Sequence, residues 1–184
     1  MGDRDRLISL LRERSVTRGD FVLSSGRRSS YYVDCRRTTM HAQGLALIGR
    51  LGLEAIRAAQ WDAAAVGGLT LGADPVAYAI ARASVDSPPL IHGFTVRKAA
   101  KQHGTGRRIE GCFEPSARVV VVEDVITSGA SALEAAAAVR EAGGAVAGVL
   151  AVVDREEGGR EAITAHGLEV VALASVRELL EEAS

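Results

Sequence analysis

The residues best suited to chemistry lie between Val119 and Ala132. Four consecutive valines precede Glu123 and Asp124, and the loop sequence VITSGASA follows. A run of valines is typical of a buried strand, and a carboxylate beside it needs polar partners because burying an unpaired charge is costly. Two neighbouring carboxylates can accept hydrogen bonds from the vicinal hydroxyls of a sugar. This pattern therefore predicts a sugar-binding site at the end of a strand.

The loop after these carboxylates is suited to binding a phosphate. Thr127, Ser128 and Ser131 can donate from their hydroxyls, and Gly129 lets the backbone approach a ligand closely. Backbone N–H groups at the start of the following helix add a positive site for an anion. The loop lacks the GxxxxGK(S/T) pattern of a P-loop. An ordinary turn and capped helix would also use Ser and Thr, but two acids directly after four valines favour a binding site.

A second candidate region, residues 97–108, has the sequence RKAAKQHGTGRR. It concentrates basic residues in a chain whose formal net charge is −1, so any attraction for anions must be local. A charge run is often only a solvated face. This one follows an apolar strand and contains two glycines, so we expect a mobile loop that closes over a polyanion. Its cations would stabilise negative charge that builds on a leaving group.

Apolar periodicity predicts helices and strands that alternate along most of the chain. Asp74 with Pro75 is expected to begin one helix, and Ser175 with Glu178 forms a capping box for the last one. Helices are expected over residues 3–14, 41–59, 74–83, 131–142 and 161–166 and after Ser175, and strands over residues 21–23, 31–33, 63–66, 90–96, 118–122, 146–153 and 168–173.

This alternation predicts an α/β fold with a mainly parallel central sheet flanked by helices. We expect a single domain over residues 1–184, in which residues 1–38 form a small N-terminal hood beside the sheet. In such sheets ligands bind where the carboxyl ends of strands meet the amino ends of helices. The two carboxylates and the basic region are therefore expected at one edge of the sheet.

Residues 119–132 resemble the phosphoribosyl pyrophosphate (PRPP) signature of type I phosphoribosyltransferases. The resemblance implies the fold of that superfamily, and it implies that Glu123 and Asp124 bind the ribose hydroxyls. It also implies that the loop binds the 5-phosphate through Val125, Ile126, Thr127, Ser128, Gly129, Ala130 and Ser131. The motif does not select the base.

The order R-K-x-x-K-x-H-G in the basic region resembles the catalytic loop of orotate phosphoribosyltransferases. It implies that the pyrophosphate is contacted by Arg97, Lys98, Lys101 and His103. It also implies that Lys101, His103 and Asp124 are catalytic. In that family the loop of one subunit completes the site of its partner, which implies a homodimer with shared active sites.

Further segments resemble the same family. Residues 21–34 resemble its N-terminal hairpin, which implies that the backbone near Tyr32 and Val33 meets the orotate ring. Arg155 follows a predicted strand and resembles the arginine that binds the orotate carboxylate, and a guanidinium is suited to bind a carboxylate through two hydrogen bonds. Thr127 is expected at the same edge of the sheet and is the fourth residue expected to bind orotate. Residues 67–72 resemble the pyrophosphate loop, so the resemblance covers nearly the whole chain.

The sequence departs from the family pattern at three positions. Ser24 stands where many relatives carry a lysine, and Thr70 and Leu71 stand where many carry a Tyr-Lys pair. The replacements remove a cation near the phosphates. They predict a lower rate or affinity, unless Arg27 and Arg28 compensate, or they mark a separate branch of the family.

The resemblance implies that the protein transfers the phosphoribosyl group of PRPP to orotate, giving orotidine 5′-monophosphate and pyrophosphate. It implies Mg²⁺ as cofactor, held mostly by substrate and water, so no dedicated metal-binding cluster of protein residues is expected. Two alternatives remain open. A purine-base phosphoribosyltransferase would have no use for Arg155 as a carboxylate anchor, and a PRPP-sensing regulatory protein would add a basic face or a helix-turn-helix.

Composition indicates which partners and which cellular compartment to expect. The near-neutral charge predicts no nucleic-acid partner, and the charged N-terminal segment, without a long apolar run, predicts no membrane span. Cys35 and Cys112 have no metal-binding or redox spacing and are expected to be reduced thiols. We therefore expect a cytoplasmic protein.

Overall fold

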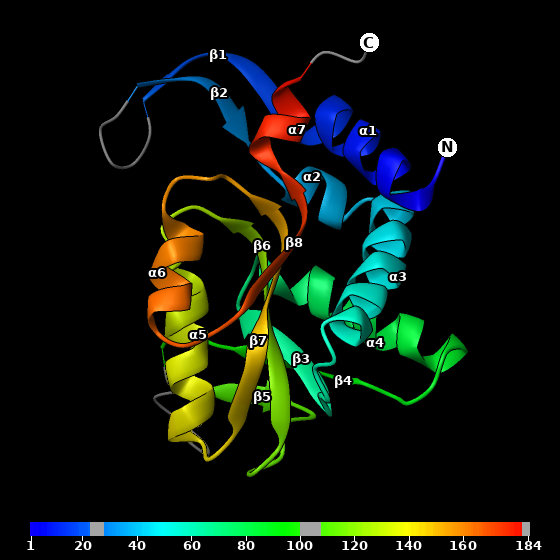
Figure 1. The fold of residues 1–184 in the computed structure, drawn as a ribbon, viewed down its shortest axis with the longest axis vertical. Helices are drawn as coiled ribbons and strands as arrows, with labels where there is room; N and C mark the ends of the chain where they lie inside the picture. The colour runs from blue at the N-terminus through cyan, green and yellow to red at the C-terminus, as the bar shows by residue number, and fades with distance from the viewer. Residues whose placement is uncertain (23–27, 100–107, 182–184) are drawn as a thin grey trace.

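The computed structural model describes residues 1–22, 28–99 and 108–181. A six-stranded mixed sheet forms its centre, in the order β5-β4-β3-β6-β7-β8 (Figure 1). Neighbouring strands run parallel except β4 and β5, which are antiparallel. This arrangement confirms the expected α/β fold. The strands are β3 (Ala65–Leu69), β4 (His92–Val96), β5 (Ile109–Gly111), β6 (Arg118–Ile126), β7 (Ala145–Asp154) and β8 (Val170–Ser175).

Helices cover both faces of this sheet. On one face lie α3 (Ala42–Ala58) and α4 (Ala73–Asp86), and on the other lie α5 (Ala130–Glu141) and α6 (Gly159–Ala165) (Figure 1). Side chains of β6 alternate between the two apolar layers, because successive residues of a strand point to opposite faces. Val120 and Val122 belong to the layer under α3 and α4, whereas Val119 and Val121 belong to the layer under α5.

The N-terminal segment forms a separate layer at one end of the sheet. It consists of α1 (Asp3–Ser15), β1 (Val16–Val22), β2 (Arg28–Val33) and α2 (Arg36–Thr39). The strands β1 and β2 form their own antiparallel pair, and α1 packs against α3 and against α7 (Val176–Leu180). We call residues 1–22 and 28–39 the hood. It lies beyond the edge of the sheet where β6 and β7 end (Figure 1).

Four local expectations were wrong. The strand expected over residues 21–23 is part of β1, which begins at Val16 and pairs with β2 from there. The strand β6 was expected to end at Val122 but continues through both carboxylates to Ile126, because β7 pairs with it along that whole length. The helix α4 begins at Ala73 with Gly72 as its N-cap, so Asp74 is not the capping residue. The strand β3 includes Gly67 and Gly68 instead of stopping before them.

The short elements β5 and α2 were not predicted. Three and four residues long, they are too short to show a period in the sequence. The capping box at the start of α7 was predicted correctly, since the Ser175 hydroxyl accepts from the Glu178 N–H and the Glu178 carboxylate accepts from the Ser175 N–H.

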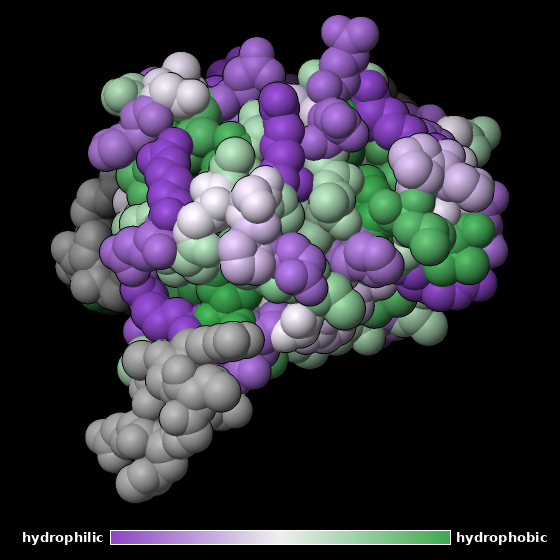
Figure 2. Space-filling model, turned by 90° about the horizontal axis from the view of Figure 1, so that it is seen from below, coloured by the Kyte–Doolittle hydropathy of each residue, from purple (hydrophilic) through white to green (hydrophobic). Residues whose placement is uncertain are grey.

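The face of the molecule that points away from the hood has a mixed surface. Hydrophobic side chains gather there in small patches with hydrophilic side chains between them (Figure 2). In the described part of the chain, no helix combines the length and the hydropathy that crossing a bilayer requires.

Candidate active site

A cavity of about 380 Å³ lies between the hood and the edge of the sheet. Its residues come from five places in the sequence: the end of β2 with the residues after it, the end of β3 with its following loop, the segment after β4, the end of β6 with its following loop, and the residue after β7. The described residues that line it are Tyr32, Val33, Asp34, Cys35, Arg36, Leu69, Thr70, Leu71, Gly72, Lys98, Glu123, Asp124, Val125, Thr127, Ser131 and Arg155.

The predicted phosphate loop adjoins this cavity. Residues 125–132 and Glu123 border a smaller hollow of about 90 Å³, a size that suits a small anion. Gly129 has φ of +78°, a left-handed conformation that disfavours side chains, and a Cβ on it would lie 2.8 Å from the carbonyl oxygen of Gly159. Glycine is therefore required here both by the backbone conformation and by the close approach of α6.

The two carboxylates of β6 have different surroundings. Glu123 is only 7% exposed, and its Oε2 has no hydrogen-bond partner among the described residues. Burial, together with the negative charge of Asp124, raises the pKa of Glu123 to about 9. The Oδ1 of Asp124 accepts from the N–H of Val125 at 2.9 Å. A Cβ on Gly72 would lie 2.5 Å from that same oxygen, so glycine lets the loop after β3 approach Asp124.

The four residues expected at the base meet in the cavity. Tyr32, Val33, Thr127 and Arg155 all line it, although they come from three separate segments. Arg155 is 7% exposed. Its guanidinium carbon lies 5.4 Å from the centre of the Tyr31 ring, close enough for a cation–π contact.

Arg155 also has a carboxylate neighbour. Its Nη2 lies 2.7 Å from Oε1 of Glu157, an ion pair without hydrogen-bond geometry, and its Nε has no hydrogen-bond partner in the described chain. An arginine that only formed a surface ion pair would be exposed. The pair with Glu157 exists, but the guanidinium is buried at the cavity and retains donors that a ligand carboxylate can use.

The basic region is only partly described. Lys98 lines the cavity, whereas Arg97 lies in a neighbouring hollow with Thr70 and pairs with Glu110, with 3.7 Å between Nη1 and Oε1. Lys101 and His103 lie outside the described residues, as does Ser24.

Two cavity residues were not assigned to the site from the sequence. Cys35 and Arg36 line the cavity just after β2. The Arg36 Nε lies 2.8 Å from Oδ1 of Asp34, so this arginine is held at the cavity mouth by its own neighbour. The sequence around these residues has no pattern that indicates a binding site. They reach the cavity because the hood lies over the edge of the sheet.

The raised pKa of Glu123 predicts a pH-dependent stability. Between the ordinary value of 4.5 and about 9, the unfolded chain has lost this proton while the folded chain keeps it, so the free energy of unfolding falls as pH rises through that window. Glu123→Gln should remove this slope and stabilise the protein at pH 8 by about 1–4 kcal/mol. Urea denaturation from pH 5 to pH 9 measures it.

A companion variant tests the cause of this shift. Asp124→Asn removes the nearby negative charge but leaves the burial of Glu123, so it should flatten the slope only in part. Equal slopes for the native chain and Glu123→Gln would mean that Glu123 is ionised in the folded protein.

The sheet order, the hood and the strand–loop–helix site at the end of β6 together define a phosphoribosyltransferase of type I. A scan against protein-family models found no match. The chain is 50% identical to the orotate phosphoribosyltransferase of Aquifex aeolicus over 184 residues, which cover 98% of this chain and 99% of that protein.

Solved structures agree with the sequence comparison. The orotate phosphoribosyltransferase of Mycobacterium tuberculosis H37Rv in complex with Fe(III) dicitrate is 50% identical, with a TM-score of 0.87 over 98% of this chain and 100% of that one. The same enzyme in complex with PRPP has a TM-score of 0.83 at 48% identity, over 97% of this chain and 99% of that one. The chain therefore belongs to the orotate phosphoribosyltransferase family.

Proposed function

We propose that this protein transfers the phosphoribosyl group of PRPP to orotate, giving orotidine 5′-monophosphate and pyrophosphate. The observation that carries the proposal is the buried guanidinium of Arg155, which lies in one cavity with the two carboxylates of β6 and next to the phosphate loop. A cation in that place suits a base that carries a carboxylate. Membership of the family supports the same reaction.

The proposed roles are those that the resemblance to the family implies. Residues 125–131 bind the 5-phosphate, Glu123 and Asp124 bind the ribose hydroxyls, and Arg155 binds the orotate carboxylate. The ring of orotate then lies between Thr127 and the backbone of Tyr32 and Val33. As the C1–pyrophosphate bond breaks, the ribose gains oxocarbenium character, and the work of the protein is to position two anions and stabilise the departing charge.

The basic region supplies that charge stabilisation in the proposal. Arg97, Lys98, Lys101 and His103 contact the pyrophosphate, and Lys101, His103 and Asp124 are the catalytic residues. We further propose a homodimer in which residues 97–108 of one subunit complete the site of the other. The resemblance to the family supports this sharing of the site.

The described donor set fits Mg²⁺ that is held mainly by substrate and water. No group of three or more His, Cys, Asp or Glu side chains that could hold a metal ion occurs in residues 1–22, 28–99 and 108–181, but Asp124 has a partly exposed carboxylate at the cavity. When bound, Mg²⁺ would neutralise charge on the pyrophosphate. We place the protein in the cytoplasm, and its two free thiols, Cys35 and Cys112, suit a reducing compartment.

Pyrophosphate release with four candidate bases tests the proposal. With PRPP and Mg²⁺ present, orotate should be turned over, and uracil, adenine and hypoxanthine should react at least about a hundredfold more slowly, because none of them offers Arg155 a carboxylate. Comparable release with adenine or hypoxanthine would favour a purine-base enzyme, and no release with any base would favour a PRPP-sensing role.

A further inference from the structure

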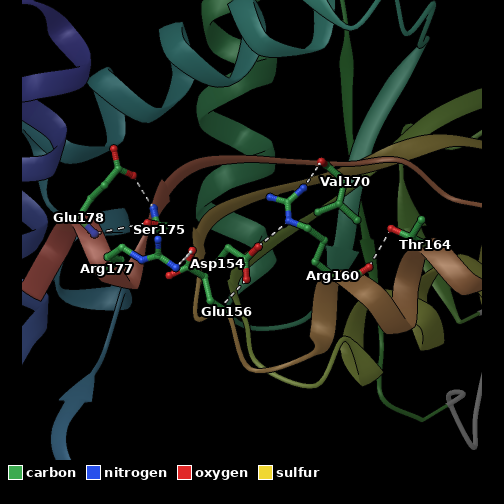
Figure 3. A network of polar contacts seen from close by, with 8 residues as sticks. All are labelled: Asp154, Glu156, Arg160, Thr164, Val170, Ser175, Arg177 and Glu178. Carbon is green, nitrogen blue, oxygen red and sulfur yellow. Dashed lines mark hydrogen bonds and ion pairs between the residues drawn. The ribbon is translucent and has the colours of Figure 1, made fainter.

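The turn between β7 and α6 sets the direction of Arg155. It begins at Asp154, the last residue of β7, which is only 3% exposed. The Oδ1 of Asp154 accepts from the N–H of Glu156 at 2.8 Å, so the carboxylate bridges the residues on either side of Arg155. Figure 3 shows Asp154 between Glu156 and Arg160.

This bridge stabilises a backbone that would otherwise be unfavourable. Glu156 has φ of +55°, in the left-handed region that a residue with a Cβ rarely adopts. An Asp side chain that accepts from the N–H two residues on is a standard means of holding such a turn. If Asp154 turned away, the backbone at Glu156 would relax and the Cα–Cβ direction of Arg155 would change.

Arg160 holds Asp154 in place. Its Nε donates to Oδ2 of Asp154 at 2.8 Å, and its Nη1 donates to the carbonyl of Val170 at 2.6 Å (Figure 3). A carboxylate as buried as Asp154 needs a counter-charge, and Arg160 supplies it. One guanidinium therefore ties together the end of β7, the start of α6 and the start of β8.

The turn carries Arg155, whose guanidinium must point into the cavity to bind a ligand there. Arg155 has a long side chain, and in the described part of the chain that side chain forms an ion pair with Glu157 of the same turn and contacts the face of the Tyr31 ring. A long side chain gains precise geometry only when its backbone is fixed and neighbouring groups support it. Neither Asp154 nor Arg160 lines the cavity, so any effect they have on the base is indirect, and Arg155 is the cavity residue next to Asp154 in the chain.

We propose that Asp154 and Arg160 are positioning residues for base recognition: through the β7–α6 turn, they hold the Arg155 guanidinium where it binds the orotate carboxylate. The inference rests on the proposed function, because it takes orotate as the base. The PRPP site has supports of its own, since its carboxylates belong to β6 and its loop leads into α5, and it contacts α6 at the backbone of Gly159.

Steady-state kinetics of Arg160→Met test the proposal. The KM for orotate should rise about tenfold, because the guanidinium of Arg155 loses its fixed aim. The KM for PRPP and kcat should stay within about twofold of the native values, and Arg160→Lys, which keeps a charge beside Asp154, should restore part of the affinity for orotate.

Arg177→Met is the matched control. Arg177 lies beside the same turn and its Nη2 is 3.5 Å from Oε1 of Glu156, but its side chain is 74% exposed and it has no contact with Asp154 (Figure 3). Loss of this pair should leave both KM values unchanged.

A folding defect can be separated from a positioning defect. Thermal unfolding checks each variant, and Asp154→Ala replaces Arg160→Met if the latter does not fold, because it removes both the acceptor of the Glu156 N–H and the partner of Arg160. The same rise in KM for orotate alone is expected. An equal rise in KM for both substrates, or no rise in KM for orotate, would overturn the positioning role. A native protein that is inactive with orotate would overturn the proposed function instead.

Discussion

Lys101→Ala should lower kcat by about a hundredfold or more, with a smaller change in the KM for either substrate. Lys101 belongs to the basic region that resembles the family's catalytic loop, and it lies outside the described residues. Its proposed partner is the pyrophosphate, which gains charge as the bond to the ribose breaks. Removal of a charge partner that acts mainly in the transition state reduces turnover more than it reduces substrate affinity.

Arg82→Ala is a suitable control for this prediction. Arg82 is a cation on α4 with a side chain that is 66% exposed, and it pairs only with the neighbouring Asp86 in the described chain. Its loss should leave kcat unchanged. A native kcat for Lys101→Ala would remove the basic region from the mechanism.

The homodimer adds a second test of the same residue. If residues 97–108 complete the partner's site, inactive Lys101→Ala and Asp124→Asn subunits should regain activity when mixed, because some hybrid dimers contain one site with both native residues. Size-exclusion chromatography and subunit exchange of tagged chains must accompany the assay. No recovery after demonstrated exchange would mean that each site is completed within one chain.

Arg155→Ala should weaken orotate binding by about tenfold to a hundredfold. The variant removes a buried, charged hydrogen-bond donor whose loss costs about 1.5–3 kcal/mol. Affinity for PRPP should hardly change, because the proposed anchors of PRPP belong to β6 and the following loop. Isothermal titration calorimetry with each ligand measures the two affinities separately.

Arg155→Lys distinguishes charge from geometry at this position. A lysine keeps the positive charge but cannot make the paired contacts of a guanidinium, so its affinity for orotate should fall between those of the native protein and Arg155→Ala. An equal loss of both ligands would indicate a folding defect. Unchanged orotate affinity in Arg155→Ala would leave the pair with Glu157 as the only role of this arginine.

The sequence by itself determined the short-range parts of this protein. The run from Val119 to Val122 predicted a central buried strand, and the loop from Thr127 to Ser131 predicted the phosphate site, because strand burial and helix-start chemistry depend on neighbouring residues. The structure confirms the buried strand and the capping box of Ser175, which is equally local. Even so, the end of β6 was misjudged, since its pairing with β7 carries the strand past Glu123.

Only the tertiary structure decided which distant residues share a site. Cys35 and Arg36 reach the cavity because the hood lies over the sheet edge, and Asp124 meets Gly72 because the β3 loop ends beside β6. The hydrogen bond from Arg160 to the carbonyl of Val170 depends on α6 and β8 packing together. Such contacts join segments far apart in the chain, so their geometry follows from how whole elements pack and leaves no periodic signal in the sequence.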